Sequence, residues 1–375
     1  MTSAHASQKL RGAVVTLANR ATEPRHEKDV HEQLARRLAA LQGMDFLGEY
    51  DPSEHYSQQL YYVPSGTLVG IDSARELGIE GERDLFGGVV PHAFVETKAI
   101  SHPLMRPNAD SPIGWSRTFA GLVEGSVLAG YSVFSLRDAR EAGRRLLHEG
   151  PLRLKPVRAS GGRGQELVDG VQALDQALEH IDEAELAQYG LVLENNLDRV
   201  TTFSVGQVRV AARVLSYYGT QRLTEDNNGH TVYGGSDLVV VEGDFEALLK
   251  LELPDKTRLA ITQAQVYDAA ASACFRGFRA SRRNYDIAQG VDGRGRACSG
   301  VLEQSWRIGG ASGAEVAALE AFAQGSGASA VRASTVELYG EAKTVPEGAT
   351  VLFRGEDEEV GFVTKYVTLE EYGNS

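Results

Sequence analysis

Short apolar runs and one amphipathic pattern divide the beginning of the chain. Residues 13–18, 46–49 and 60–64 are mainly apolar runs with the length of strands. Between the first two runs, residues 26–42 carry apolar side chains at helical spacing, at Val30, Leu34, Leu38 and Leu41. This order of strand, helix and strands predicts a βαβ-like unit at the N-terminus.

Turn-forming residues then mark a boundary between residues 97 and 114, where three prolines stand close together: Pro103, Pro107 and Pro112. Beyond it we predict helices over 115–127, 138–148 and 171–181, and strands over 132–135, 152–157 and 190–194. A compact segment with this rhythm of strands, loops and helices is typical of a small lid domain.

Strand patterns dominate the remainder of the chain. We predict strands over 203–215, 237–241, 284–291 and 298–306, and a closing hairpin from 350–354 and 362–369. Helical patterns cover 258–275 and 314–323. The whole chain of 375 residues is therefore predicted to be an α/β (α+β) protein of two or three subdomains.

Composition and charge narrow the function classes. A formal net charge of −13 argues against a nucleic-acid partner, because a phosphate backbone demands clustered cations. No apolar run approaches the roughly 20 residues that cross a bilayer, and residues 1–11 lack the apolar core of a secretory signal. Two cysteines, Cys274 and Cys298, cannot build a disulfide framework. We therefore expect no nucleic-acid or membrane partner and a cytoplasmic location.

A lysine before a glycine-rich loop is the first group of residues that could bind a ligand. In the predicted strand 152–157, alternation places Arg153 and Lys155 on one face. The loop that follows contains Gly161, Gly162, Arg163 and Gly164. Glycines let backbone N–H groups approach phosphate oxygens, and an ammonium group adds a point charge. The combination suits a polyphosphate; a solvated surface lysine before a turn is the alternative.

A carboxylate pair is the second constellation. A four-residue loop over 293–296 pairs Asp292 with Ala297, and the same register sets Asp286 opposite Glu303. Opposed like charges repel, so this register requires a reason, and a bound cation is one. Magnesium, which takes oxygen ligands, suits such a pair. A slipped register with both acids in solvent is the alternative.

Polar and basic residues surround this predicted acidic face. Period-two alternation places Ser305 on the same face as the second acid. Arg282 and Arg283 stand just before the pair, and Arg307 stands just after it. Such guanidinium groups could hold phosphate oxygens or a substrate carboxylate in bidentate fashion. Each arginine taken singly is also compatible with an ordinary surface position.

Taken in order, these pieces resemble the ATP-grasp superfamily. The resemblance covers residues 97–312 and rests on Lys155 in its strand, the loop 161–164, the strand 191–194, Asp286, and the run Glu-Gln-Ser-Trp-Arg at 303–307. More closely, the runs 88–92, 97–99, 282–286 and 300–310 resemble a bacterial family of unknown function over nearly the whole chain. That family brings no substrate with it.

The superfamily resemblance implies an ATP-grasp fold with ATP and Mg²⁺ as cofactors. A pre-grasp α/β domain (1–114) would precede two α+β lobes that sandwich the nucleotide. The small lid lobe would span 115–192, and the C-terminal lobe with the metal site would span 193–375.

Position by position, the resemblance also implies nucleotide-binding residues. Lys98 and Lys155 match the two nucleotide lysines, and Gly161, Gly162, Arg163 and Gly164 match the mobile phosphate loop. Glu194, with Asn195 and Leu197 just after it, matches the adenine hinge. Thr202 occupies the position where a ribose-binding glutamate is usual, which is a departure from the superfamily pattern.

The same resemblance implies metal-binding and catalytic residues. Asp286, Glu303 and Ser305 match the metal ligands, although Ser305 stands where asparagine, a stronger ligand, is usual. Arg307 stands where many members carry an arginine, and Arg283 is predicted to act beside it.

These residues predict an ADP-forming ligase. Mg-ATP would phosphorylate a small-molecule carboxylate, and an amine or a thiol would attack the acyl phosphate. An ATP-grasp kinase and a nucleotide-binding protein that has lost catalysis are the alternatives, and Ser305 and Thr202 favour the second of them. The sequence leaves the oligomeric state open, a homodimer included.

Overall fold

The N-terminal part of the computed structural model is a parallel three-stranded sheet with one helix against it; the structure describes residues 12–158, 164–325 and 328–372. β1 (Gly12–Leu17) lies between β2 (Asp45–Glu49) and β3 (Gln59–Pro64). α1 (Arg25–Gln42) joins β1 to β2, and its apolar face is buried against β1 through Leu34 and Leu38. The predicted βαβ-like unit is therefore confirmed.

Short elements connect this unit to the rest of the chain. They are β4 (Leu68–Val69), α2 (Ile71–Glu76), β5 (Gly88–Val90), the 3₁₀ helices η1 (Ala93–Glu96) and η2 (Lys98–Ser101), and α3 (Phe119–Leu122). β5 lies between β4 and the distant β13 (Arg279–Ala280). The predicted helix over 115–127 is reduced to the single turn of α3. Gly125 follows it in a left-handed conformation (φ +81°), which a helix cannot accommodate.

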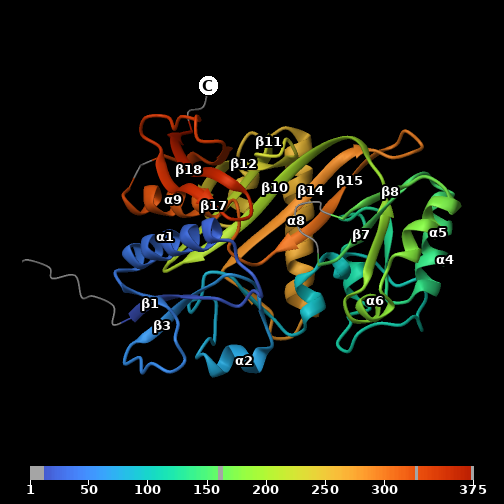
Figure 1. Ribbon diagram of the computed structural model, residues 1–375, viewed down its shortest axis with the longest axis horizontal. Coiled ribbons are helices and arrows are strands. Elements are labelled where there is room, and N and C mark those ends of the chain that lie inside the picture. The colour runs from blue at the N-terminus through green and yellow to red at the C-terminus, as the bar shows by residue number, and fades with distance from the viewer. Residues whose placement is uncertain (1–11, 159–163, 326–327, 373–375) are drawn as a thin grey trace, which may run out of the picture.

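An antiparallel four-stranded sheet forms the next layer, in the order β6-β9-β7-β8. Its strands are β6 (Gly130–Val133), β7 (Leu152–Pro156), β8 (Glu166–Val168) and β9 (Leu191–Asn195). The helices around it are α4 (Leu136–Leu147), α5 (Val171–Glu179) and α6 (Glu183–Tyr189). The layer has a hydrophobic core of its own, which includes Leu154, Leu174 and Leu193. Figure 1 shows it in green, beside the ends of the long strands of the next sheet.

An eight-stranded antiparallel sheet is the largest feature of the molecule, in the order β15-β14-β10-β11-β12-β16-β18-β17. Its strands are β10 (Asp198–Val210), β11 (Arg213–Glu225), β12 (Thr231–Glu242), β14 (Arg282–Val291), β15 (Ala297–Ser305), β16 (Ala330–Tyr339), β17 (Thr350–Asp357) and β18 (Gly361–Glu371). Three helices accompany it: α7 (Phe245–Leu249), α8 (Asp255–Cys274) and α9 (Ser312–Ala323).

One predicted strand is a hairpin in the structure. The run 203–215 belongs to two strands, β10 and β11, which turn at Ala211 and Ala212. Ala211 takes a positive φ of 54°, a conformation usually left to glycine or asparagine. Two alanines carry no turn signal, so the sequence pattern did not reveal this reversal.

Opposite faces of the large sheet are covered by different helices. Tyr285 of β14 donates to Asp268 of α8 (2.6 Å), whereas Arg282, an even-numbered position of the same strand, contacts Glu315 of α9. Because successive residues of a strand alternate between faces, α8 and α9 lie on opposite sides of β14.

The N-terminal unit shares its core with the large sheet. α1 packs against α9, and Leu34 and Val63 are buried in one cluster with Val208 of β10 and Leu319 of α9. Figure 1 shows α1 and α9 side by side. The mixed α/β class is confirmed, and this arrangement of an N-terminal unit and two sheet lobes agrees with the ATP-grasp resemblance. Within the described ranges, the helices lack the length and apolar character that a membrane crossing requires.

A glycine of β10 offers a test of this packing. A Cβ atom on Gly206 would lie 2.3 Å from the carbonyl oxygen of Arg283 and 2.3 Å from the hydroxyl of Tyr217. Gly206→Ala should therefore lower the free energy of unfolding by roughly 1–3 kcal/mol, because either a strand or a fixed side chain must move. Urea denaturation measures this. Gly121→Ala, where nothing lies within 4 Å, is the matched control; equal stabilities for the two variants would contradict the packing.

Candidate functional site

Two carboxylates lie opposite each other at the edge of the large sheet. Asp286 of β14 is the direct partner of Glu303 of β15, as the sequence predicted. The predicted partnership of Asp292 with Ala297 is wrong, because Val291 pairs with Ala297 and the connection is one residue longer. A bulge between Asp286 and Ile287 then shifts the register by one residue and restores the acidic pair.

The two acids have different electrostatic surroundings. Glu303 forms an ion pair of 2.7 Å with the buried Lys98 of η2. Burial and the charge of Glu303 raise the pKa of Asp286 to about 6, although Asn284 donates to it at 3.0 Å. Ionising one carboxylate beside another costs free energy, and a bound divalent cation would lower that cost.

The donor set around the pair suits magnesium chemistry but is small. Ser305 pairs with Asn284 across the same two strands, so its side chain shares the face of the acids. Its hydroxyl accepts a hydrogen bond of 3.2 Å from Arg282. In the part of the chain that the structure describes, no group of three or more His, Cys, Asp or Glu side chains could hold a metal ion. A metal here would need further oxygens from a hydroxyl, water or a phosphate.

Asn284 is a site residue that the sequence interpretation missed. Its Oδ1 accepts a hydrogen bond from Ser204 (2.7 Å) and lies 2.9 Å from the Tyr217 hydroxyl, so its amide group faces Asp286. Period two relative to Asp286 was the signal that could have found it.

The predicted cluster of three arginines is only partly present. Arg282 is buried on the acidic face, where its guanidinium binds Glu315 of α9 at 2.9 Å. Arg283 points to the opposite face and pairs with Asp268 of α8 (3.2 Å) and Glu82. The expectation that Arg283 flanks the acids is therefore wrong, because neighbouring residues of a strand cannot share a face.

Arg307 differs from these arginines in its partners. Burial, together with the positive charges of Arg20 and Arg282, lowers its pKa. Its Nη1 donates to the carbonyl of Ile308 at 2.8 Å. Among the described residues it forms no salt bridge with an acid. A partly buried guanidinium without a carboxylate partner is suited to an anionic ligand.

A buried ionic trio occupies the four-stranded sheet. The ammonium of Lys155 on β7 contacts Glu194 on β9, and Nε2 of His102 lies 3.1 Å from the other oxygen of Glu194. Burial alone would raise the pKa of Glu194, but Lys155 and His102 hold it at about 2. His102 was missed because its proline context was interpreted as a turn, and no local pattern indicates its partner.

The 3₁₀ helix η2 lies at the seam between the two lobes. Its residues contact β15 of the large sheet and β9 of the four-stranded sheet. The Ser132 hydroxyl of β6 donates to the carbonyl of Ala99, and Gln304 of β15 donates to the carbonyl of Thr97 at 2.7 Å. Lys98 is thereby placed between the acid pair and the layer that carries Lys155.

The remaining predicted residues lie around this seam. Asn195 donates its backbone N–H to Ala129 (2.9 Å), while its side-chain oxygen is buried without a hydrogen-bond partner among the described residues. Leu197 is buried in a small cluster with Leu128 and Ala288. Thr202 of β10 is partly buried opposite Ala288, on the face of Asp286.

Only part of the predicted phosphate loop can be placed. Gly164 takes a left-handed conformation (φ +66°) beside the ring of Pro156. Gly161, Gly162 and Arg163 lie outside the described residues.

The raised pKa of Asp286 has a consequence for stability. A carboxyl with a folded pKa of about 6 and an unfolded pKa of 3.8 contributes stability below pH 3.8 and loses it as pH rises through about 6. In metal-free protein, Asp286→Asn should therefore be more stable than wild type at pH 8 by about 1–3 kcal/mol, and this advantage should vanish near pH 4.

Chemical denaturation with a chelator at several pH values measures this difference. Glu303→Gln is the matched control, because it removes the acid that pairs with buried Lys98 and should lower stability at pH 8. A pH-independent difference between wild type and Asp286→Asn would contradict the assigned electrostatics.

Comparison with known proteins places the chain in a family. Solved structures similar to it include N5-carboxyaminoimidazole synthetase from Staphylococcus aureus complexed with ADP (13% identity, 98% of this chain, 95% of that chain, TM-score 0.49). Biotin carboxylase from Campylobacter jejuni is also similar (11% identity, 96% of this chain, 87% of that chain, TM-score 0.49). So is D-alanyl-alanine synthetase A from Vibrio cholerae (12% identity, 79% of this chain, 89% of that chain, TM-score 0.43). No curated protein matches the chain. Residues 14–367 match the family described as protein of unknown function (DUF3182), and the chain belongs to that family.

Proposed function

We propose that this protein is an ATP-dependent ligase that joins a small-molecule carboxylic acid to an amine or a thiol through an acyl phosphate, releasing ADP and phosphate. The observation that supports it most is the ion pair between Lys98 and Glu303. It brings a lysine of the lobe seam to the acid pair at the edge of the large sheet. A polyphosphate bound there would meet cationic groups from both lobes.

Lys98 and Lys155 are the groups proposed to hold the phosphates. Both are buried and paired with glutamates, so their charges are already positioned before a nucleotide arrives. Preorganised charges stabilise a transferring phosphoryl group without reorganisation during the reaction. The backbone after Glu194, with the unpartnered oxygen of Asn195, is proposed to receive the adenine, and Thr202 the ribose.

Asp286 and Glu303 are the proposed magnesium ligands, with Ser305 as a weaker third. Their oxygen donors and the raised pKa of Asp286 fit a hard divalent cation. When bound, Mg²⁺ would supply neutralisation of the charge on the phosphate oxygens. The Lys98 contact would then be shared between Glu303 and the phosphates.

Arg307 is proposed to orient the acid substrate. Among the described residues Arg307 forms no ion pair with an acid, although Glu27 and Glu303 lie near enough to attract it, whereas Arg282 is neutralised by Glu315. A carboxylate oxygen held in line would attack the γ-phosphorus, and ADP would leave. An amine would then attack the acyl carbon, expel orthophosphate and lose a proton. Exclusion of water by the four-stranded lobe would protect the acyl phosphate.

Lys155 provides a direct test of the nucleotide site. Lys155→Met should weaken binding of Mg-ATP by one to two orders of magnitude, on the order of 1.4–3 kcal/mol, because a charged phosphate contact is lost. Isothermal calorimetry measures the affinity. Lys256→Met, at an exposed position of α8, is the control.

Because Lys155→Met leaves Glu194 buried without its lysine, the double variant with Glu194→Gln should recover thermal stability but not affinity for Mg-ATP. An unchanged affinity of Lys155→Met for Mg-ATP would contradict the proposed role of Lys155.

The chemical products provide the second test. Turnover should yield ADP and orthophosphate rather than AMP and pyrophosphate, because Lys98 and the acid pair are proposed to gather at the β,γ end of ATP. Hydroxylamine should trap the acyl phosphate as a hydroxamate. ADP release without a trappable acyl species, from an acid that stimulates turnover, would favour a kinase.

A nucleotide-binding protein without catalysis is the second candidate. The observation that favours it is the Ser305 hydroxyl, which already accepts a hydrogen bond from Arg282 instead of being free for a metal. Mg-ATP binding without ADP release for any acid would support that reading.

A further inference from the structure

The side-chain amide of Asn284 is enclosed by polar groups on the acidic face of β14. Asn284 is only 7% exposed, and it precedes Asp286 by two residues, so the two side chains share a face. In the structure its Nδ2 donates to Oδ1 of Asp286 at 3.0 Å. On the other side of the amide, Oδ1 lies 2.7 Å from the hydroxyl of Ser204 and 2.9 Å from the hydroxyl of Tyr217. The amide therefore lies between one carboxylate and two hydroxyl groups.

The Tyr217 hydroxyl has one hydrogen, and two oxygen atoms compete for it. Oε1 of Glu315 lies at 2.6 Å, and Oδ1 of Asn284 lies at 2.9 Å. Glu315 is fully buried and forms an ion pair with Arg282, and a charged acceptor at the shorter distance forms the stronger hydrogen bond. The hydrogen is therefore donated to Glu315. As a result, the oxygen atoms of Tyr217 and Asn284 face each other without a hydrogen between them.

A half-turn of the amide about its Cβ–Cγ bond removes this conflict, because it exchanges the positions of Oδ1 and Nδ2. The two hydrogens of Nδ2 would then be donated to the oxygen atoms of Ser204 and Tyr217, across the same 2.7 Å and 2.9 Å. Oδ1 of Asn284 would instead lie 3.0 Å from the carboxylate oxygen of Asp286. Two oxygen atoms at this distance need a hydrogen or a cation between them. The hydroxyl side of the amide thus favours the orientation that offers an oxygen ligand beside Asp286.

The distance between these two atoms fits coordination of one cation by both. Magnesium takes oxygen ligands at about 2.0–2.1 Å in octahedral geometry, so adjacent ligand atoms lie about 2.9 Å apart. The 3.0 Å between the amide of Asn284 and Asp286 is close to this spacing. Ser305, directly opposite Asn284 on β15, is less available because its hydroxyl already accepts a hydrogen bond from Arg282. A carbonyl oxygen is also a suitable ligand for a hard divalent cation.

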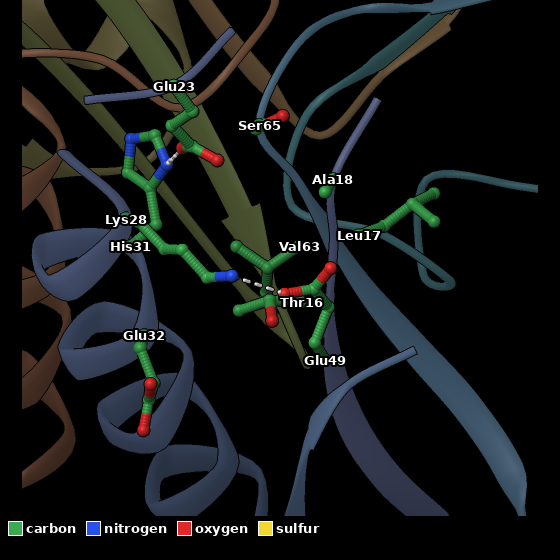
Figure 2. Close-up of a pocket in the computed structure, with 10 residues that line it drawn as sticks. All are labelled: Thr16, Leu17, Ala18, Glu23, Lys28, His31, Glu32, Glu49, Val63 and Ser65. Carbon is green, nitrogen blue, oxygen red and sulfur yellow. Dashed lines mark ion pairs between the residues drawn. The ribbon is translucent and has the colours of Figure 1, made fainter. Parts of the chain in front are cut away.

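The charged side chains of a cavity in the N-terminal unit provide a contrast. The cavity has a volume of about 40 Å³ and lies between α1 and the ends of β1 and β3 (Figure 2). Glu23 pairs with His31 there, and Lys28 pairs with Glu49 at 2.7 Å. Each of these acids has a basic partner inside the protein, so the pairs need no ligand. Asn284 differs, because the groups around it cannot all be satisfied by the protein alone.

We propose that Asn284 is an oxygen ligand of the divalent cation at the acid pair. Without the cation, its amide donates to Asp286. With the cation, the amide turns, and its Oδ1 joins the carboxylates of Asp286 and Glu303 as a protein ligand. Ser204 and Tyr217 then accept the two hydrogens of Nδ2 and hold the turned amide in place. This inference rests on the proposed function and completes its magnesium site.

Binding of Mn²⁺, used as a paramagnetic substitute for Mg²⁺, tests the inference without any turnover. Mn²⁺ is titrated into the full chain, alone and with ADP, and electron paramagnetic resonance measures the free ion against a blank without protein. Asn284→Leu, which keeps the size of the side chain but removes its oxygen, should raise the Kd for Mn²⁺ at least about tenfold. Asn284→Asp, which keeps an oxygen ligand but cannot donate, should not raise it. Gln289→Leu is the matched control, because it removes a buried amide of β14 that donates to Lys256 of α8 (2.7 Å), and it should leave the Kd unchanged.

Tyr217→Phe distinguishes a ligand from an amide that only supports Asp286. The turned amide loses an acceptor in this variant, so the Kd for Mn²⁺ should rise about two- to tenfold. An amide that only donates to Asp286 would lose nothing, because the hydrogen of Tyr217 is already donated to Glu315. Thermal unfolding without Mn²⁺ identifies variants that fail to fold. If Asn284→Leu is one of them, Tyr217→Phe and Asn284→Asp decide the question.

The outcomes separate this inference from the proposed function. An equal Kd for wild type and Asn284→Leu, an equal loss of affinity in Asn284→Leu and Asn284→Asp, or an unchanged Kd in Tyr217→Phe overturns the role of Asn284. Each of these results leaves the magnesium site of Asp286 and Glu303 standing. Absence of Mn²⁺ binding by the wild-type chain, both alone and with ADP, overturns the proposed metal site as well.

Discussion

The opposition of Asp286 and Glu303 across two neighbouring strands is the constraint on which the rest of the candidate site depends. Like charges in this arrangement repel, and the chain keeps it by a bulge that restores the register. Lys98 neutralises Glu303, and Asn284 donates to Asp286, yet the pKa of Asp286 remains at about 6. The protein alone therefore leaves this pair incompletely compensated, which is the electrostatic condition that favours a divalent cation.

The three arginines near the acid pair differ in whether an acidic side chain of the protein forms an ion pair with them. Arg282 is fully buried against Glu315, which also accepts from the Tyr217 hydroxyl at 2.6 Å. Removal of either partner would leave an uncompensated buried charge, so this network is expected to be rigid. Arg283 performs a comparable structural role on the opposite face with Asp268. Arg307 lies near other cations and forms no ion pair with an acid among the described residues, so it is the arginine that we propose for anion binding.

Packing between the N-terminal unit and the large sheet fixes the position of one relative to the other. Because α1 and α9 share one hydrophobic core, the loop that carries Arg20 is fixed relative to the strand end that carries Arg307. On the other side, the buried trio of Lys155, Glu194 and His102 holds charge inside the four-stranded sheet. Ionisable groups retained at such a desolvation cost commonly mark functional sites, which is one reason why the nucleotide site is proposed here.

The sequence by itself determined the features that depend on near neighbours. Strand alternation and helical spacing located α1, β7, β14 and β15. The short loop between β14 and β15 indicated that Asp286 lies opposite Glu303, but the pairing next to the loop was wrong by one residue, and a bulge that the sequence did not reveal restores the acid pair. Only the tertiary structure decided the partners of His102 and Lys98, and it also formed the β10–β11 turn without a turn residue at Ala211. These contacts join segments that are far apart in the chain or follow from the packing of whole sheets. Local periodicity contains no information about which distant charge will face a given side chain.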